Sequence, residues 1–144
     1  MIAVDTNILI YAHRAESPWH ARADPIIAEL AEGSSQWAIP WPCLHEFLAI
    51  VTHPRIYAPP TPLSDAVEQL QCWLESPNLV LLSEGRGFSS SWFEIVGKAR
   101  VKGGAVHDAR IAALCLHHGV SKLLSADRDF SRFPQLRTEN PLLK

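Results

Sequence analysis

The sequence predicts an α/β domain with a short, largely parallel sheet, and three observations support this. Short apolar runs suited to buried strands alternate with longer segments of helical periodicity, no linker or low-complexity tract divides the chain, and its 144 residues fit one domain spanning 1–144. Hydrophobic residues make up 47% of the chain and charged residues 19%, as is typical of a folded globule.

The predicted elements alternate from the first residues onward. Strands are predicted over residues 2–4, 38–39, 79–82 and 122–125, and helices over 19–32, 43–51, 64–75, 92–101 and 106–118. Gly33 and Gly119 stop the helices that precede them, and Ser64 is expected to cap the third helix. Pro42 suits a first helical turn, while Pro54 ends the helix that Pro42 opens. The chain therefore alternates strands and helices as a parallel sheet requires.

The net charge of −2 conceals a division along the chain. Residues 1–85 carry three Arg and ten acidic residues, whereas residues 86–144 carry ten Lys or Arg and five acidic residues. The second part is therefore suited to a phosphate backbone, although an ordinary mixed surface explains the same counts.

Targeting and cysteine patterns predict a reduced, cytoplasmic protein. The first residues lack a basic segment and reach an acid at once, which is unlike a secretory signal, and no apolar run is long enough to span a membrane. The cysteines are odd in number and widely spaced, at Cys43, Cys72 and Cys115. This spacing fits neither a zinc site nor a disulfide framework, so all three thiols are expected in the core.

Several acidic residues stand where a purely structural role explains them poorly. Asp5 follows the first strand, and the carboxyl ends of parallel strands are where ligands bind; the alternative is that Asp5 only caps the helix beginning at Thr6. Glu46 lies in the nearly all-apolar helix 43–51, which predicts burial and hence a cation or a charged partner. The alternative for Glu46 is an edge position in contact with water.

Two more acidic positions lie in the second half of the chain. Asp108 shares the helical stripe of Ile111, Ala112 and Cys115, so it should face inward at the amino end of its helix. The helix dipole accounts for an acid there but not for its inward direction. Asp127 and Asp129 follow the strand 122–125, where a polar turn is the alternative.

Together these acids predict a site for a divalent cation. Clustered carboxylates repel one another and need a counter-charge, and Mg²⁺ or Mn²⁺ takes carboxylate oxygens together with water and phosphate oxygens. Such a cation can activate water and stabilise the leaving oxygen of a phosphodiester.

Four segments resemble the PIN-domain family, and most closely the VapC-type toxins of bacterial toxin–antitoxin pairs. They are VDTNILIY over 4–11, the helix around Glu46, HDAR over 107–110 with the Ala-rich helix after it, and SADRDF over 125–130. The tail segments SRFP over 131–134 and NPL over 140–142 also match one VapC subgroup. The resemblance covers the whole chain in order.

The resemblance implies a three-layer α/β/α sandwich and a Mg²⁺- or Mn²⁺-dependent endoribonuclease, in which water attacks a phosphodiester bond of RNA. It implies an acidic set formed by Asp5, Glu46, Asp108 and Asp127, with Asp5 and Asp108 as metal ligands. Thr6, Asn7 and Ser125 are then supporting polar groups, and Asp129 competes with Asp127 for the fourth acidic position. A VapB-type antitoxin whose tail covers the site and a toxin homodimer are also implied.

Two alternative functions remain to be weighed. A phosphatase with an aspartyl nucleophile would need a second acid two residues after Asp5, where the chain has Asn7. A non-catalytic RNA-binding module of the same fold would be expected to have lost one of the acids, and none is missing. Cleavage with and without Mg²⁺ distinguishes the module from the enzyme.

Basic and aromatic residues suggest further surfaces. Lys98, Arg100, Lys102 and Arg110 are predicted to face RNA, the alternative being a solvated helix face. Trp19, Trp37 and Trp41 are expected in the core, the alternative being an aromatic groove for an antitoxin helix.

Overall fold

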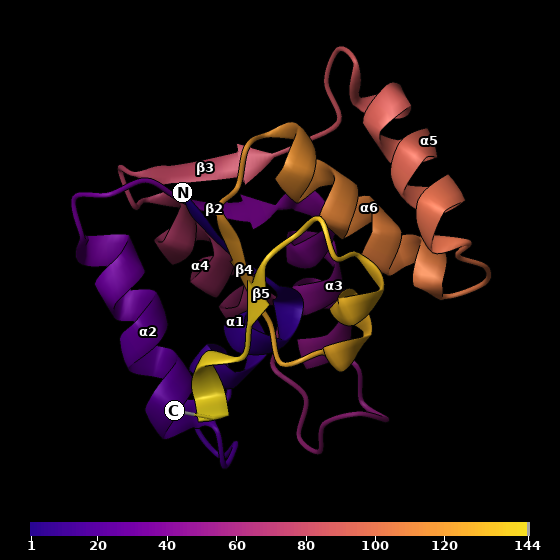
Figure 1. Cartoon of the computed structure of the whole chain (residues 1–144). Coiled ribbons are helices and arrows are strands. Elements are labelled where there is room, and N and C mark those ends of the chain that lie inside the picture. Colours follow the sequence, from indigo (N-terminus) through magenta and orange to yellow (C-terminus); the bar gives the residue numbers. More distant parts are fainter. Residues whose placement is uncertain (144) are drawn as a thin grey trace.

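Five parallel strands form the central sheet of the computed structural model, which describes residues 1–143 (Figure 1). The strands are β1 (Ile2–Val4), β2 (Trp37–Pro40), β3 (Leu79–Leu82), β4 (Lys122–Leu124) and β5 (Thr138–Glu139), in the order β3-β2-β1-β4-β5. The central strand β1 pairs Ala3 with Ala38 of β2 on one side and with Leu123 of β4 on the other. The predicted parallel sheet is therefore confirmed.

Helices cover both faces of this sheet. They are α1 (Thr6–His13), α2 (His20–Glu32), α3 (Trp41–Val51), α4 (Leu63–Leu74), α5 (Phe88–Ala99) and α6 (Ala105–His117), with two short 3₁₀ helices, η1 (Arg128–Arg132) and η2 (Pro141–Leu143). The connections from β1 to β2 and from β2 to β3 step one way across the sheet, whereas the connection from β3 to β4 steps back. Because such connections are right-handed, α1–α4 lie on one face and α5–α6 on the other, which gives the three layers of an α/β/α sandwich (Figure 1).

Several elements differ from the sequence prediction. The helix α1 was not among the predicted helices, and α3 begins at Trp41, two residues before its predicted start. The helix α5 begins at Phe88 rather than at residue 92, and it ends at Ala99 because Arg100 takes a left-handed conformation with φ of 51°. Ser64 is not a cap: α4 begins at Leu63, behind Pro62. The strand β5 was not predicted, since its two residues are too few to show a period.

The core confirms some predicted burial and corrects the rest. Cys43, Cys115 and Trp37 are fully buried between the layers. Cys72 is exposed on the outer side of α4, so the prediction of three core thiols was wrong for this residue. Trp19 and Trp41 were also wrongly expected in the core, because they precede or open helices at the surface and are 37% and 39% exposed. Within residues 1–143, no helix is long and apolar enough to cross a membrane.

Candidate active site

Asp5 lies at the carboxyl end of the central strand and also caps α1. Its Oδ1 accepts hydrogen bonds from the Thr6 backbone nitrogen at 2.8 Å and from Cys43 Sγ at 3.5 Å. Its Oδ2 accepts one from Ser125 Oγ at 2.7 Å. The side chain is 4% exposed, so these donors replace the water that burial removes. The capping role and the site role, which the sequence presented as alternatives, are thus compatible.

The environment of Asp5 raises the pKa of its carboxyl group. Burial is the largest cause, and the negative charge of Glu46 adds to it, while the hydrogen bonds from Ser125 and Thr6 act in the opposite direction. The hydrogen-bond donors thus stabilise the charged carboxylate only in part, and burial still disfavours it overall. A cation beside it would remove that disadvantage.

Asn7 connects the Asp5 turn to the segment after β4. Its Oδ1 accepts a hydrogen bond from the Ala126 backbone nitrogen at 3.0 Å, and its Nδ2 lies 3.4 Å from both Asp5 Oδ2 and Ser125 Oγ. Ser125 Oγ in turn accepts a hydrogen bond from the Asp127 backbone nitrogen at 3.0 Å. Asn7 and Ser125 therefore fix the two strand ends relative to each other. The Cys43 contact was not predicted, because it depends on which side of α3 faces the strand end.

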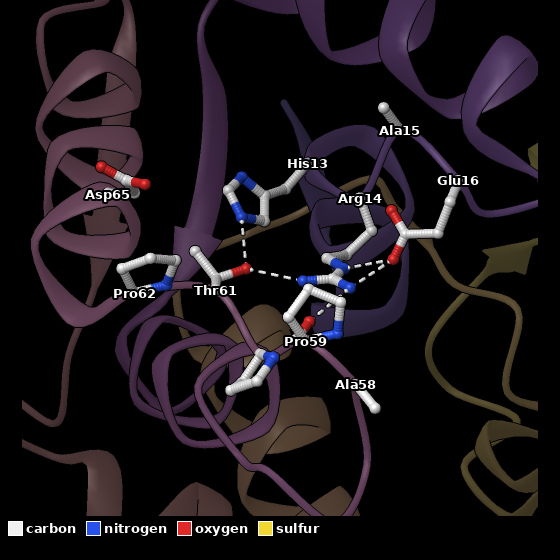
Figure 2. A pocket seen from close by; sticks show the side chains of 10 residues that line it. His13, Arg14, Ala15, Glu16, Ala58, Pro59, Thr61, Pro62 and Asp65 are labelled. Atoms are coloured by element: carbon white, nitrogen blue, oxygen red, sulfur yellow. Dashed lines mark hydrogen bonds and ion pairs between the residues drawn. The ribbon is translucent and has the colours of Figure 1, made fainter.

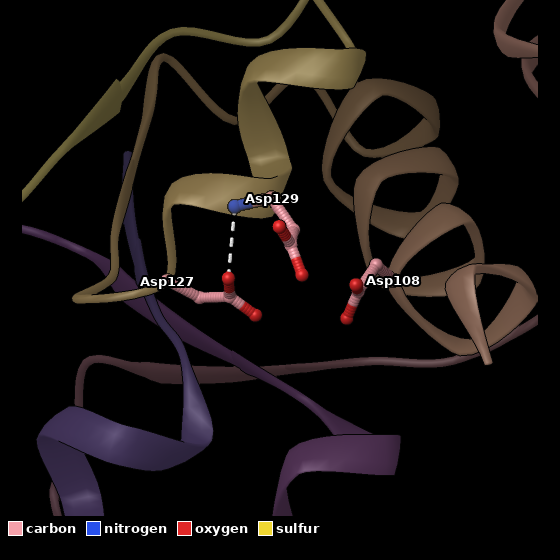
Figure 3. Close-up of side chains that lie close together, drawn as sticks. All are labelled: Asp108, Asp127 and Asp129. Atoms are coloured by element: carbon pink, nitrogen blue, oxygen red, sulfur yellow. Dashed lines mark hydrogen bonds between the residues drawn. The ribbon is translucent and has the colours of Figure 1, made fainter.

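Three aspartates converge beside this turn, as Figure 3 shows. Asp108 projects from the first turn of α6, while Asp127 and Asp129 come from the segment after β4. One carboxylate oxygen from each of the three lies within 4.8 Å of the others. The backbone nitrogen of Asp129 donates to Asp127 Oδ1 at 2.8 Å, which holds the turn in shape. Asp127 and Asp129 therefore both belong to the cluster.

The environment of Asp108 raises the pKa of its carboxyl group. Its pKa is raised from 3.8 to about 6, first by burial and then by the charges of Asp127, Asp5, Asp129 and Glu46, in that order. Asp108 is half-buried, in agreement with the inward direction predicted from its helical stripe. Asp108, Asp127 and Asp129 therefore form one group, and Asp5 and Glu46 act on Asp108 through their charges.

Glu46 requires a correction, because it is exposed and not buried in an apolar helix. The buried side of α3 is formed by Cys43, Leu44, Phe47 and Val51, whereas Ala49 is an apolar residue on the solvent side. The apolar composition of α3 therefore did not mean that it was buried all round. Glu46 contributes through charge at the open rim of the cluster, where it raises the pKa of Asp5 and Asp108.

The donor chemistry of this cluster fits a hard divalent cation. Asp108, Asp127 and Asp129 offer carboxylate oxygens from two elements, and Asp5 lies near enough for its charge to act on Asp108. Oxygen ligands of this kind suit Mg²⁺ and Mn²⁺, whereas neither buried thiol, Cys43 or Cys115, belongs to the group of three.

The four predicted RNA-facing residues lie on α5, on α6 and on the turn between them. Lys98 pairs with Glu94 at 2.8 Å on the exposed side of α5, and Arg100 and Lys102 are exposed at the turn that leads to α6. Arg110 instead forms an ion pair with Glu84, in the segment between β3 and α5. Exposed pairs of this kind contribute about 0–1 kcal/mol, so their cations remain available to an anionic ligand.

A separate hollow of about 520 Å³ lies at the opposite end of α1 from Asp5 (Figure 2). Arg14 stands in it, donates to Glu16, to Thr61 Oγ1 and to the carbonyl of Pro59, and lies 4.2 Å from the centre of the Tyr57 ring. Because the chain itself takes up these donors, Arg14 ties the α3–α4 connection to α1. Its role in the hollow is structural.

Comparison with known proteins agrees with this geometry. The family model of the PIN domain matches residues 2–136. This chain belongs to the PIN-domain family. The family resemblance predicted from its four segments is thereby confirmed.

Relatives of this PIN-domain chain include ribonucleases of the VapC group. It is 32% identical over 142 residues to Ribonuclease VapC43 of Mycobacterium tuberculosis, covering 99% of this chain and 96% of that protein. It is 29% identical over 137 residues to Ribonuclease VapC48 of the same organism, covering 95% and 94%. The crystal structure of VapBC2 from Rickettsia felis bound to a promoter DNA fragment shares its fold, with a TM-score of 0.70 at 19% identity over 96% of this chain and 98% of that one.

Proposed function

We propose that this chain is the ribonuclease toxin of a toxin–antitoxin pair and that it hydrolyses RNA phosphodiester bonds with a divalent cation, Mg²⁺ or Mn²⁺. The observation that carries the proposal is the convergence of acids from separate elements on Asp108, whose pKa is raised to about 6. Similarity to VapC ribonucleases over nearly the whole chain supports the reaction class.

In this proposal Asp5 and Asp108 hold the cation, and Asp127 and Asp129 complete the oxygen cluster. A divalent cation there would supply a Lewis acid that lowers the pKa of water and stabilises the oxygen leaving from phosphorus. Ser125 orients Asp5 and favours its ionised form by donating to its Oδ2 at 2.7 Å.

Glu46 and the amide of Asn7 have distinct parts in the proposed site. Glu46 stands exposed at the rim, where its carboxylate can take a proton from water that enters with the substrate. Asn7 supports the two strand ends through its bond to the Ala126 nitrogen. An amide that serves this purpose is no general acid, which leaves the aspartyl phosphatase alternative unsupported.

Cleavage of RNA by the purified, antitoxin-free chain tests the proposal. We expect cleavage with Mg²⁺ or Mn²⁺, none with EDTA, and none after Asp108→Asn. Glu68→Gln is the matched control, because Glu68 is an exposed acid on α4, a helix that contributes no acid to the cluster, and this variant should cleave as the unmodified chain does. Equal cleavage by the Asp108→Asn protein, or in EDTA, would refute the proposal. Binding of RNA without cleavage would show a non-catalytic RNA-binding module.

The proposal extends to a VapB-type antitoxin, a homodimer and a cytoplasmic location. The antitoxin is supported by the VapBC complex whose fold this chain shares. Co-purification with the product of any small gene found immediately upstream tests the antitoxin, and light scattering of the isolated chain tests the dimer.

A further inference from the structure

A hollow of about 340 Å³ lies between α5 and α6, on the helical layer that also carries Asp108. Phe88 and Trp92 of α5 line it on one side, and Val106, His107 and Arg110 of α6 line it on the other. This volume is at the small end of the range of about 300–1,000 Å³ seen for ligand pockets. The hollow therefore suits one planar group better than a helix or a strand of another protein.

The floor of the hollow is aromatic and well supported. Phe88 is 8% exposed and packs edge-on against the His117 ring with 5.9 Å between ring centres. Trp92 is half-buried and lies against Phe93 with 5.2 Å between ring centres. An aromatic surface held in this way can stack against another flat ring without first becoming ordered.

The rim of the hollow carries the polar side chains of Arg110, His107 and the acidic Glu84. Arg110 and His107 are both exposed, and Arg110 is held by an ion pair with Glu84 whose two side chains are 45% and 36% exposed. The surrounding segment, residues 86–144, carries ten Lys or Arg against five acidic residues. An aromatic floor with polar side chains at its rim complements a base, whose flat face can stack and whose edge offers hydrogen-bond donors and acceptors, which is how single-stranded RNA is commonly recognised.

The hollow and the acidic cluster are lined by adjacent residues of α6. His107 lines the hollow and Asp108, the next residue, faces the cluster, so the two sites lie about 100° apart around the same turn of α6. A strand whose phosphate lies at the cluster would bring a neighbouring base to the α5–α6 side. We propose that this hollow binds one base of single-stranded RNA near the bond to be cleaved, an inference that rests on the proposed ribonuclease function.

Substitution of Trp92 tests the inference by binding alone. Affinity for a short single-stranded RNA would be measured by fluorescence anisotropy in EDTA, so that no cleavage occurs. We expect Trp92→Leu to weaken binding by about 5- to 150-fold, the range for the loss of one base–aromatic stack. The slope of log affinity against log salt should stay unchanged, because every interaction with phosphate is kept. Trp19→Leu is the matched control, since Trp19 is also a tryptophan, is 37% exposed and does not line the hollow.

A second arm changes the RNA and not the protein. A single abasic nucleotide is placed at each position of the RNA in turn. We expect one position at which the missing base lowers the affinity of the unmodified chain but does not further lower the affinity of the Trp92→Leu protein. Unchanged affinity of the Trp92→Leu protein, equal losses for both variants, or no sensitive abasic position would overturn the inference. A change of oligomeric state in the Trp92→Leu protein would also overturn it, since a second copy of the chain would then cover this face.

The two proposals fail in distinguishable ways. RNA that is bound with a sensitive abasic position but never cleaved in Mg²⁺ would support the base subsite and refute the ribonuclease. RNA that is cleaved equally well by the unmodified chain and the Trp92→Leu protein, with equal affinity, would support the ribonuclease and refute the subsite.

Discussion

Asp108→Asn should make the metal-free protein more stable at neutral and alkaline pH. The raised pKa means that the folded protein holds the Asp108 proton more tightly than the unfolded chain does. The unmodified protein therefore loses stability as the pH rises from 3.8 through about 6, and above that range it carries the full penalty of an ionised Asp108. An asparagine of the same shape carries no charge and no such penalty.

The size of the effect follows from the shift. A change from 3.8 to about 6 corresponds to about 3 kcal/mol at about 1.4 kcal/mol per pH unit. Because Asp108 is only half-buried, solvent screening reduces this to about 1–2 kcal/mol. We therefore expect the melting temperature at pH 8 to rise by roughly 3–8 °C in the Asp108→Asn protein, and to differ little at pH 4.

Thermal unfolding followed by circular dichroism in EDTA, at pH 4 and pH 8, measures this directly. Glu68→Gln again serves as the control, because it removes an exposed acid from α4 and should change the melting temperature little at either pH. An Asp108→Asn protein that is less stable than the unmodified chain at pH 8, or equally shifted at both pH values, would refute the argument that an ionised Asp108 destabilises the fold.

Three further outcomes are expected from the same geometry. Asp5→Ala should abolish cleavage and also lower the free energy of unfolding by about 1–3 kcal/mol, since it removes a helix cap and leaves the Ser125 hydroxyl without its acceptor; urea unfolding measures this. MgCl₂ at a hundredfold excess over its dissociation constant should stabilise the unmodified chain by about 2.7 kcal/mol, but not the Asp108→Asn protein, as measured by thermal unfolding. Replacing Lys98, Arg100 and Lys102 by Gln should flatten the log–log salt dependence of RNA binding by up to about 2, at about 0.7 for each phosphate that is no longer neutralised, and leave the cleavage position unchanged.

The order of the elements and much of the acidic cluster could be predicted from local patterns. The run at residues 2–4 became β1, and the acid after it stands at the strand's carboxyl end. The stripe that placed Asp108 beside Ile111 and Cys115 also indicated the direction of its side chain. These signals succeeded because strand ends and helix stripes are set by neighbours in the sequence.

What failed depended on tertiary contacts. Glu46 was expected to be buried because its helix is apolar, but composition does not say which apolar residues face another layer. The ion pair of Arg110 with Glu84 joins two different elements, so charge patterning along the chain did not reveal it. The bond from Cys43 Sγ to Asp5 joins residues 38 apart in sequence, which no local pattern can indicate.

The two acids proposed as metal ligands are stabilised in different ways, and this assigns them different functions. Asp5 is nearly fully buried, and donors from Thr6, Ser125 and Cys43 already hold its carboxylate in one orientation. Among the residues that the structure describes, Asp108 has no such donors, and its pKa is raised to about 6 first by burial and then by the charges of the neighbouring acids. Asp5 thus also stabilises the fold through its hydrogen bonds, whereas the charged form of Asp108 is the one that a nearby cation would stabilise. Loss of Asp5 should therefore impair folding and chemistry together, while loss of Asp108 should remove the chemistry and leave a more stable protein.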